Sequence, residues 1–315
     1  MAEAAKTAHM RLASFNLFFF PAHAPHRIAR GPEDLELVAR VLARLDADVL
    51  VLPEILDLAV LERLLEDVGQ RIGRDYRVRD ENGKWLASAG SAQILKVAMA
   101  FDARPLTLVR RHKLPSPAGR SVVLELSERA SGETLTVIGV HLRSSGAAPN
   151  PDVDDPGAPK RTRETHAIAA WVEGFDADGT FVGLPTADAV LLGDFNEPRG
   201  RASLAPLTEG AMTSWHWHEP TLDPAGASDG DDDTAPWSSY LDRSVLDHVF
   251  TSPRVTARVS GEARIYAFDR DPTIADPAWM HADGPTIIPG IGTPPHAVPN
   301  LYRVSDHRPI YLDLA

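Results

Sequence analysis

Several short segments of the chain place polar side chains next to strongly apolar residues, and their residue types suit the hydrolysis of a phosphate ester. The segments are Ser14-Phe15-Asn16-Leu17, Leu52-Pro53-Glu54-Ile55, Val140-His141-Leu142, Gly193-Asp194-Phe195-Asn196, Leu246-Asp247-His248 and Ser305-Asp306-His307. Because burying a polar group without a partner is costly, we expect each side chain to emerge where a strand meets a loop. Such positions are best explained if they converge on one pocket.

Oxygen ligands for a divalent cation are present among these residues. Glu54 and Asp306 supply carboxylates and Asn16 supplies a carbonyl oxygen, and such hard ligands favour Mg²⁺ or Mn²⁺ over zinc. The chain contains no cysteine, which excludes thiolate zinc sites, disulfide bonds and cysteine nucleophiles. The sequence therefore predicts a magnesium or manganese site that includes Asn16, Glu54 and Asp306.

The remaining polar residues could supply the hydrolytic chemistry. Asp194 and Asn196 lie two positions apart, so in an extended turn both can reach one point and there position and deprotonate a water molecule. His141 and His307 can donate hydrogen bonds to the phosphate and stabilise the charge that develops on it. We expect Asp247 to orient His307 and keep it charged.

These motifs, in this order, resemble the endonuclease/exonuclease/phosphatase superfamily, which includes pancreatic-type deoxyribonucleases, abasic-site endonucleases, neutral sphingomyelinases and inositol polyphosphate phosphatases. The resemblance runs from residue 11 to the C-terminus, and its most specific parts are the stretches 193–196 and 305–307. It implies a four-layered α/β sandwich, in which two stacked mixed β-sheets are flanked by helices. The site is then expected at the edge between the two sheets.

The resemblance also implies a role for each polar position. It implies metal-site roles for Asn16, Glu54 and Asp306. It implies catalytic roles for His141, Asp194, Asn196, Asp247 and His307. In the family the Asp194–Asn196 pair activates water, and the Asp247–His307 pair forms a dyad.

The sequence departs from the family pattern at a few positions. Pro53 stands where the family often has glutamine, and it stiffens the turn before Glu54. Abasic-site endonucleases carry an acidic residue at the position of Phe18 and lack a histidine at the position of His141. These differences argue against a role in abasic-site repair.

Two substrate classes fit this chemistry. The first hypothesis is a nuclease that cleaves phosphodiesters of DNA or RNA, so the partner would be a nucleic acid. The alternative is a phosphoesterase that acts on a phospholipid head group, as a sphingomyelinase does, or on a small phosphate ester. The net charge of −12 favours the alternative, because tight nucleic-acid binders usually carry a basic surface. A binding protein that has lost its chemistry is a third hypothesis, but it should have lost several of these residues.

The polar segments must be positioned by strands and helices, and hydrophobic periodicity predicts where these lie. Strands are expected at 11–18, 48–52, 92–101, 106–109, 121–126, 134–142, 189–192, 246–251, 264–268 and 309–314. Helices are expected at 32–45, 58–68 and 162–173. Long loops are expected at 144–159, 215–240 and 269–302, and the last two should shape specificity.

Other polar features have weaker functional interpretations. His248 alternates with Asp247 along a strand, so it should point away from the site. The acidic run at 229–233 lacks the ligand pattern of a calcium loop and is interpreted as solvated. The segment 215–218 alternates tryptophan and histidine, which could stack on a base or simply pack on the sandwich. Lys160, Arg161 and Arg163 could contact substrate phosphates or only begin a helix.

We expect a single domain at 11–315, preceded by an N-terminal extension at 1–10. No apolar stretch approaches the ~20 residues that span a bilayer, so stable membrane insertion is not expected. The N-terminal residues also lack the apolar core of a secretory signal, which predicts a cytoplasmic location. We expect a monomer. Secretion is the alternative, and it would require an export signal outside this sequence.

Overall fold

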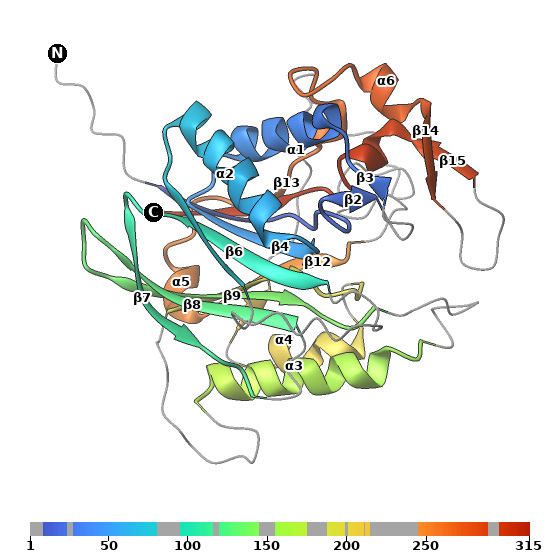
Figure 1. Cartoon of the computed structure of the whole chain (residues 1–315). Coiled ribbons are helices and arrows are strands. Elements are labelled where there is room, and N and C mark those ends of the chain that lie inside the picture. Colours follow the sequence, from blue (N-terminus) through green and yellow to red (C-terminus); the bar gives the residue numbers. More distant parts are fainter. Residues whose placement is uncertain are drawn as a thin grey trace.

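Two six-stranded β-sheets pack face to face within the part of the chain that this computed structural model describes (Figure 1). The described residues are 9–23, 28–80, 95–115, 120–144, 155–174, 188–198, 201–210, 212–214, 245–288 and 296–315. In spatial order, the first sheet consists of β13 (Arg264–Ile265), β16 (Ile310–Leu314), β1 (Met10–Ser14), β4 (Val49–Ile55), β6 (Lys96–Asp102) and β5 (Tyr76–Asp80). The second consists of β11 (Thr213–Ser214), β12 (Asp247–Thr251), β10 (Ala189–Asp194), β9 (Thr134–His141), β8 (Arg120–Glu128) and β7 (Leu106–His112).

Both sheets are mixed in the same way. In the first sheet β1 and β4 are parallel, and in the second β9 and β10 are parallel, whereas their other neighbours run antiparallel. The inner faces meet in an apolar core that includes Leu12, Val51 and Met99 of the first sheet and Val137 and Leu192 of the second. The central strands therefore read as continuous apolar runs, because both of their faces are covered.

Helices cover the outer faces of the sheets. Helices α1 (Pro32–Leu45) and α2 (Leu58–Ile72) pack on the first sheet, and α3 (Ala158–Val172) packs on the second, at the bottom of Figure 1. The side chain of Asp57 caps α2 by accepting hydrogen bonds from the backbone N–H groups of Ala59 and Val60. None of the helices described combines the length and apolar character needed to cross a membrane.

Shorter elements connect these layers. They are β2 (Ala22–His23), β3 (Ile28–Ala29), η1 (Ala202–Leu204), α4 (Ala205–Thr208), α5 (Pro253–Thr256), η2 (Phe268–Arg270), α6 (Pro277–His281), β14 (Asp283–Ile288), β15 (His296–Pro299) and η3 (Asn300–Arg303). The last five of these occupy most of the segment 269–302, which we predicted as a loop. That prediction was wrong, because elements of three to six residues are too short to show a clear hydrophobic period.

The predicted four-layered α/β sandwich is confirmed, with shifts at the ends of its elements. The first strand ends at Ser14 rather than residue 18, β4 continues through Pro53 to Ile55, and α3 begins at Ala158. Strand β5 was not predicted. The predictions for residues 1–8, 145–154 and 215–244, which include the tryptophan–histidine and acidic segments, lie outside the described residues.

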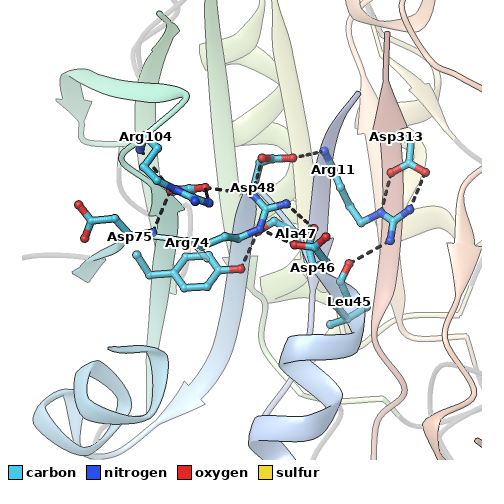
Figure 2. A network of polar contacts seen from close by, with 11 residues as sticks. Arg11, Leu45, Asp46, Ala47, Asp48, Arg74, Asp75, Arg104 and Asp313 are labelled. Carbon is cyan, nitrogen blue, oxygen red and sulfur yellow. Dashed lines mark hydrogen bonds and ion pairs between the residues drawn. The ribbon is translucent and has the colours of Figure 1, made fainter. Parts of the chain in front are cut away.

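A network of charged residues joins the strands where β1 and β4 begin (Figure 2). Arg74 Nη1 lies 2.5 Å from Asp48 Oδ1 and 3.2 Å from Asp102 Oδ2, and Arg74 Nε lies 2.6 Å from Asp46 Oδ1. The backbone N–H of Arg11 donates to Asp48 Oδ2 at 2.7 Å, which ties β1 to the same network. This end of the sheet is therefore held by ion pairs and lies opposite the end that carries Asn16 and Glu54.

Candidate active site

The polar residues predicted from the sequence lie at strand ends along one edge of the sandwich, and each sheet supplies four of them. The first sheet supplies Asn16 after β1, Glu54 in β4, and Asp306 and His307 before β16. The second sheet supplies His141 at the end of β9, Asp194 at the end of β10, Asn196 beyond it, and Asp247 at the start of β12. Because β16 is antiparallel to β1, and β12 to β10, the start of each of these strands meets the end of its neighbour.

Asp194 lies between two other site residues in the second sheet. The strand register pairs Asp194 with His141 on one side and with Asp247 on the other. The preceding Gly193 has a φ of +148°, and a Cβ atom there would lie 2.1 Å from the carbonyl oxygen of Val140. Only glycine allows this approach of the two strands, which explains the residue type before Asp194.

Glu54 enters the site from a distorted stretch of β4. Pro53 has no N–H to donate to the neighbouring strand, and the pairing with β6 shifts register between Leu52 and Ile55. Glu54 then adopts a φ of 64°. Its Oε2 accepts a hydrogen bond from the backbone N–H of Phe19 at 3.2 Å. The bulge and this bond aim the carboxylate away from the sheet and into the site.

Backbone strain is concentrated at this edge of the sandwich. Within the described residues, the non-glycine residues with positive φ are Phe18, Phe19, Asp46, Glu54 and Asn196. Asp46 ends α1, and the others belong to the site or follow Asn16 directly. Such conformations cost about 1–3 kcal/mol each, persist only where surrounding contacts hold them, and are typical of functional sites.

Asn16 links the two sheets. Its Nδ2 donates to Glu54 Oε1 at 3.1 Å and to Asp194 Oδ2 at 2.9 Å. Its Oδ1 accepts from the backbone N–H of Phe18 at 2.9 Å, and its backbone oxygen accepts from Ser305 Oγ at 2.6 Å. In this geometry Asn16 presents its amide nitrogen to both carboxylates, and its role as an oxygen ligand of a metal stays a prediction.

His307 is fixed from two sides. Its Nδ1 lies 2.7 Å from Asp247 Oδ2, and its backbone N–H donates to Ser305 Oγ at 3.0 Å. Its Nε2 is 3.9 Å from both Asp194 Oδ2 and Asp306 Oδ1. With Nδ1 engaged by Asp247, the ring presents Nε2 to the other carboxylates of the site.

The two histidines of the site have opposite charge states. Burial disfavours charge on His307, but Asp247 and Asp306 outweigh burial and raise the pKa of His307 well above its usual value. Burial, together with Arg120 and His307, holds the pKa of His141 well below its usual value. At neutral pH the site therefore contains one imidazolium, His307, and one neutral imidazole, His141.

Asp194 and Asp306 are buried with too little positive charge nearby to keep their pKa values in the usual range. Burial raises the pKa of Asp194 to about 7, although His307 opposes the shift. Burial likewise raises the pKa of Asp306 to about 7, with a contribution from Glu54 and against the effect of His307. Asp306 Oδ1 is buried and has no hydrogen-bond partner among the described residues. Crowded carboxylates that are poorly satisfied by the protein fit the binding of a divalent cation.

A second grouping of side chains supports the same conclusion. Glu54, His141 and Asp194 each bring one potential ligand atom to within 4.8 Å of the others. His141 Nε2 lies 3.7 Å from Glu54 Oε1 and 3.5 Å from Asp194 Oδ2. Glu54 is thus common to this group and to the predicted metal set with Asn16 and Asp306.

Residues behind the site hold Asn196 in place. Asn196 Nδ2 donates to the backbone oxygen of Leu142 at 3.2 Å, and its backbone N–H donates to Asp194 Oδ1 at 2.8 Å. The next residue, Glu197, accepts from Arg161 Nε at 2.7 Å, and its backbone oxygen lies 2.7 Å from His248 Nε2. His248 therefore points away from the site, as the strand alternation predicted.

The suggestion that Arg161 contacts substrate phosphates was wrong. Its side chain is 1% exposed, and its guanidinium binds both Glu197 and Asp155. No short sequence pattern indicates these ion pairs, because the two carboxylates come from different loops. Lys160 Nζ lies 3.9 Å from Glu164 Oε1 on the same helix. The Lys160 side chain is half exposed, so contact with a substrate phosphate stays a prediction for this residue.

Sequence reasoning did not identify every residue that shapes the site. Ser305 was part of a quoted motif, but its Oγ bridges Asn16 and His307, a role that only the structure reveals. The backbone N–H groups of Phe18 and Phe19 also hold site residues, and backbone groups leave no signal in residue types.

Comparisons with known proteins agree with this architecture. The model of the Endonuclease/Exonuclease/phosphatase family matches residues 13–307. The fold is similar to the human Nocturnin catalytic domain with bound sulfate (15% identity, TM-score 0.58), with 98% of this chain and 94% of that chain covered. It is also similar to a mannosyl-6-phosphatase of Bacteroides thetaiotaomicron (15% identity, TM-score 0.54), with 97% of this chain and 99% of that chain covered. A third similar structure is D. rerio TDP2 complexed with single strand DNA product (13% identity, TM-score 0.52), with 98% of this chain and 99% of that chain covered. No curated protein matches the chain at the level of sequence.

Proposed function

Because the chain belongs to the endonuclease/exonuclease/phosphatase family, whose members hydrolyse phosphoester bonds, we propose that it is a metal-dependent phosphodiester hydrolase that acts as a nuclease. The observation that carries the proposal is the convergence of both sheets on one polar cluster. Asn16 Nδ2 of the first sheet is 2.9 Å from Asp194 Oδ2 of the second, and His307 Nδ1 is 2.7 Å from Asp247 Oδ2.

The proposed cation is Mg²⁺ or Mn²⁺. Glu54 would hold it, with Asp306 and Asn16 beside it, and the group of Glu54, His141 and Asp194 offers a further set of donors. The buried, unsatisfied Asp306 Oδ1 supports such a role. When bound, a cation of this kind polarises the phosphate and offsets its negative charge.

Asp194 is proposed to accept the proton of the attacking water. A general base works best when its pKa lies near the working pH, and burial raises the pKa of Asp194 to about 7. Asn16 Nδ2 and the backbone N–H of Asn196 fix the two oxygens of this carboxylate. Asn196 would align the water, since its own side chain is anchored on Leu142.

The two histidines are proposed to bind the phosphate oxygens. Asp247 engages Nδ1 of His307 and helps to raise its pKa well above the usual value, while Nε2 faces Asp194 and Asp306. A cationic donor of this type stabilises the charge that develops on the phosphate. His141 is neutral, so it can donate one hydrogen bond from its single ring N–H.

A nuclease and a phosphoesterase for phospholipid head groups or small esters differ in the organic groups that their substrates carry on the phosphate. A structure of similar fold holds a single-stranded DNA product, which supports a nucleic acid. Another is a mannosyl-6-phosphatase, and the net charge of −12 also suits a phospholipid head group or a small phosphate ester. This second candidate therefore stays open.

A substrate panel tests the proposal. Plasmid DNA, single-stranded RNA, sphingomyelin and a chromogenic diester should be assayed with Mg²⁺ and with chelator. We expect metal-dependent cleavage of nucleic acid, and Asp194→Ala and His307→Ala should each lose at least about 10²-fold in rate. His166→Ala, which changes an exposed residue of α3, is the matched control and should retain activity. Cleavage of only sphingomyelin or the small diester would favour the second candidate, and near-normal turnover by either site variant would contradict both.

A further inference from the structure

Arg143 lies two residues beyond His141, just after β9 ends. Helix α3 holds the backbone of this residue from both sides. Its N–H donates to Glu164 Oε2 at 3.0 Å, and its carbonyl oxygen accepts from Arg161 Nη1 at 2.8 Å. Glu164 and Arg161 are each 1% exposed. Two buried polar side chains therefore fix the backbone of a residue that lies outside the helices and strands.

The alternation of side chains along β9 places Arg143 on the same side of the sheet as His141. Residues at odd positions pack between the two sheets, as Val137 does, and residues at even positions pack beside α3, as Leu142 does. The N–H of Leu142 donates to the carbonyl oxygen of Asp194 at 2.9 Å, so the chain continues the pairing of β9 with β10 to this point. Arg143 is the next odd position, and its side chain is therefore directed to the side that carries His141.

The fold makes little use of the Arg143 side chain. It is exposed, and no ion pair or hydrogen bond of its guanidinium is found in the described part of the chain. The acids around its backbone are engaged, since Glu164 accepts its N–H and Asp155 pairs with Arg161. A fixed backbone with a side chain that is open to solvent is the arrangement expected of a residue that binds a ligand.

A second arginine lies on the same face of this sheet. Arg120 begins β8 and is the register partner of His141, so the two side chains emerge on the same face. Arg120 Nη2 donates to the carbonyl oxygen of Leu142 at 3.3 Å, directly before Arg143. Burial, and after it the charge of Arg120, hold the pKa of His141 below its usual value. In a chain of net charge −12, two guanidinium groups thus belong to the side of the site that carries His141.

The spacing of these residues suits two successive phosphates. Two residues of an extended chain span about 6.8 Å, which is similar to the separation of neighbouring phosphates along an extended nucleic-acid strand. We propose that Arg143, with Arg120 beside it, binds the phosphate next to the one that is cleaved. A guanidinium suits this role because it can form two parallel hydrogen bonds to a phosphate. The inference rests on the proposed function, which places the cleaved phosphate at His141. It favours nucleic acid over sphingomyelin, whose choline group would bring a cation instead of a second anion.

Two matched substrates isolate the contribution of the second phosphate. They are thymidine 5′-(p-nitrophenyl phosphate) and the same compound with a 3′-phosphate, and the isomers with the two groups exchanged cover the opposite strand polarity. Release of p-nitrophenol with Mg²⁺ gives kcat/KM for each. In one of the two polarities we expect the wild type to prefer the doubly phosphorylated form about tenfold, which is the effect of one charge-assisted contact. Arg143→Ala should lose this preference through a higher KM, because the contact is made equally in the ground state and the transition state.

Three comparisons separate a contact with the phosphate from an effect on the fold. Arg143→Ala should change kcat/KM for the singly phosphorylated form less than about twofold, and Arg143→Lys should keep part of the preference, because it keeps the charge. Arg129→Ala removes an exposed arginine at the other end of β8 and should behave as the wild type does. An equal loss with both forms in Arg143→Ala, or an unchanged preference, would overturn the inference.

A binding measurement distinguishes failure of this inference from failure of the proposed function. Calorimetry on the full chain with Mn²⁺ compares thymidine 3′,5′-bisphosphate with the two thymidine monophosphates. A preference for the bisphosphate that disappears in Arg143→Ala would support the second phosphate site even if no p-nitrophenol is released. Metal-dependent release by the wild type with no preference in either polarity would uphold the hydrolase and overturn the second phosphate site.

Discussion

The affinity of the site for a divalent cation should rise steeply from about pH 6 to about pH 8. Asp194 and Asp306 are buried, and burial raises the pKa of each to about 7. A cation requires the ionised carboxylates, so its binding must displace the protons that these groups hold. The number of protons displaced, and hence the cost of binding, falls as the pH rises.

The size of the effect follows from the two pKa values. At about pH 6 each carboxyl group holds about 0.9 proton, and at about pH 8 it holds about 0.1 proton. Each group thus weakens binding about tenfold at the lower pH and hardly at all at the higher pH. Together they predict an affinity up to about 100-fold greater at the higher pH, which corresponds to about 2.7 kcal/mol.

The same groups set the stability of the cation-free protein. The folded-state pKa of each, at about 7, lies above the ordinary aspartate pKa of 3.8, so the folded state binds more protons than the unfolded state between these two pH values. Their contribution to the free energy of unfolding is therefore fully present below the unfolded-state pKa and is lost as the pH rises through the folded-state pKa. Chelation should consequently lower the melting temperature more at about pH 8 than at about pH 6.

Titration calorimetry with Mn²⁺ in buffers of different ionisation enthalpy measures both the affinity and the protons released. Asp306→Asn should release about one proton fewer at about pH 6 and reduce the pH effect to about tenfold. Asp75→Asn, a change outside the site, should behave as the wild type does. An affinity that differs less than about threefold over this range would refute the reasoning, because the carboxyl groups would then already be ionised.

Three further changes probe other parts of the structure. Asp247→Asn should lower the pKa of His307, cut turnover by about 10²-fold and move the alkaline limb of the kcat profile to lower pH, which pH-dependent kinetics would show; an unchanged limb would contradict the dyad. Arg74→Ala should reduce the free energy of unfolding by about 3 kcal/mol in urea titrations, because Asp48 loses its ion pair and Asp102 keeps only the one with Arg104; a loss below about 1 kcal/mol would count against the network. Gly193→Ala should destabilise the protein by about 3 kcal/mol, since its Cβ would overlap the backbone oxygen of Val140, and a normal melting temperature would show that the strands can move apart.

The sequence was informative where polar residues interrupt apolar runs. Glu54 and Asp194 could be assigned to the site because a carboxylate inside an otherwise buried strand needs a special environment. Helix α1 was equally predictable, since its apolar residues recur at helical spacing and its first turn contains proline and acids. In both cases the local pattern and the tertiary environment favour the same outcome.

Other features depend on partners that are distant along the chain. Arg161 looked like a phosphate ligand, but Glu197 folds back across 36 residues to neutralise it. The orientation of the Asn16 amide depends on the N–H of Phe18, which donates to its Oδ1, and on Glu54 and Asp194, which accept from its Nδ2. Strand β5 was missed because it has only five residues at a sheet edge with a single neighbour, too few for its alternation of apolar and charged residues to stand out. None of these outcomes is encoded within a short window of residues.

The place of β16 inside the first sheet makes the candidate site depend on the pairing of strands that are far apart in the sequence. This last strand inserts between β13 and β1, and its register with β1 runs from Met10 opposite Leu314 to Ser14 opposite Ile310. His307 lies three residues before β16, so a change that loosens the pairing of β16 with β1 should also displace His307 from Asp247. Damage at this strand would therefore alter the candidate site without changing any of the residues that form it.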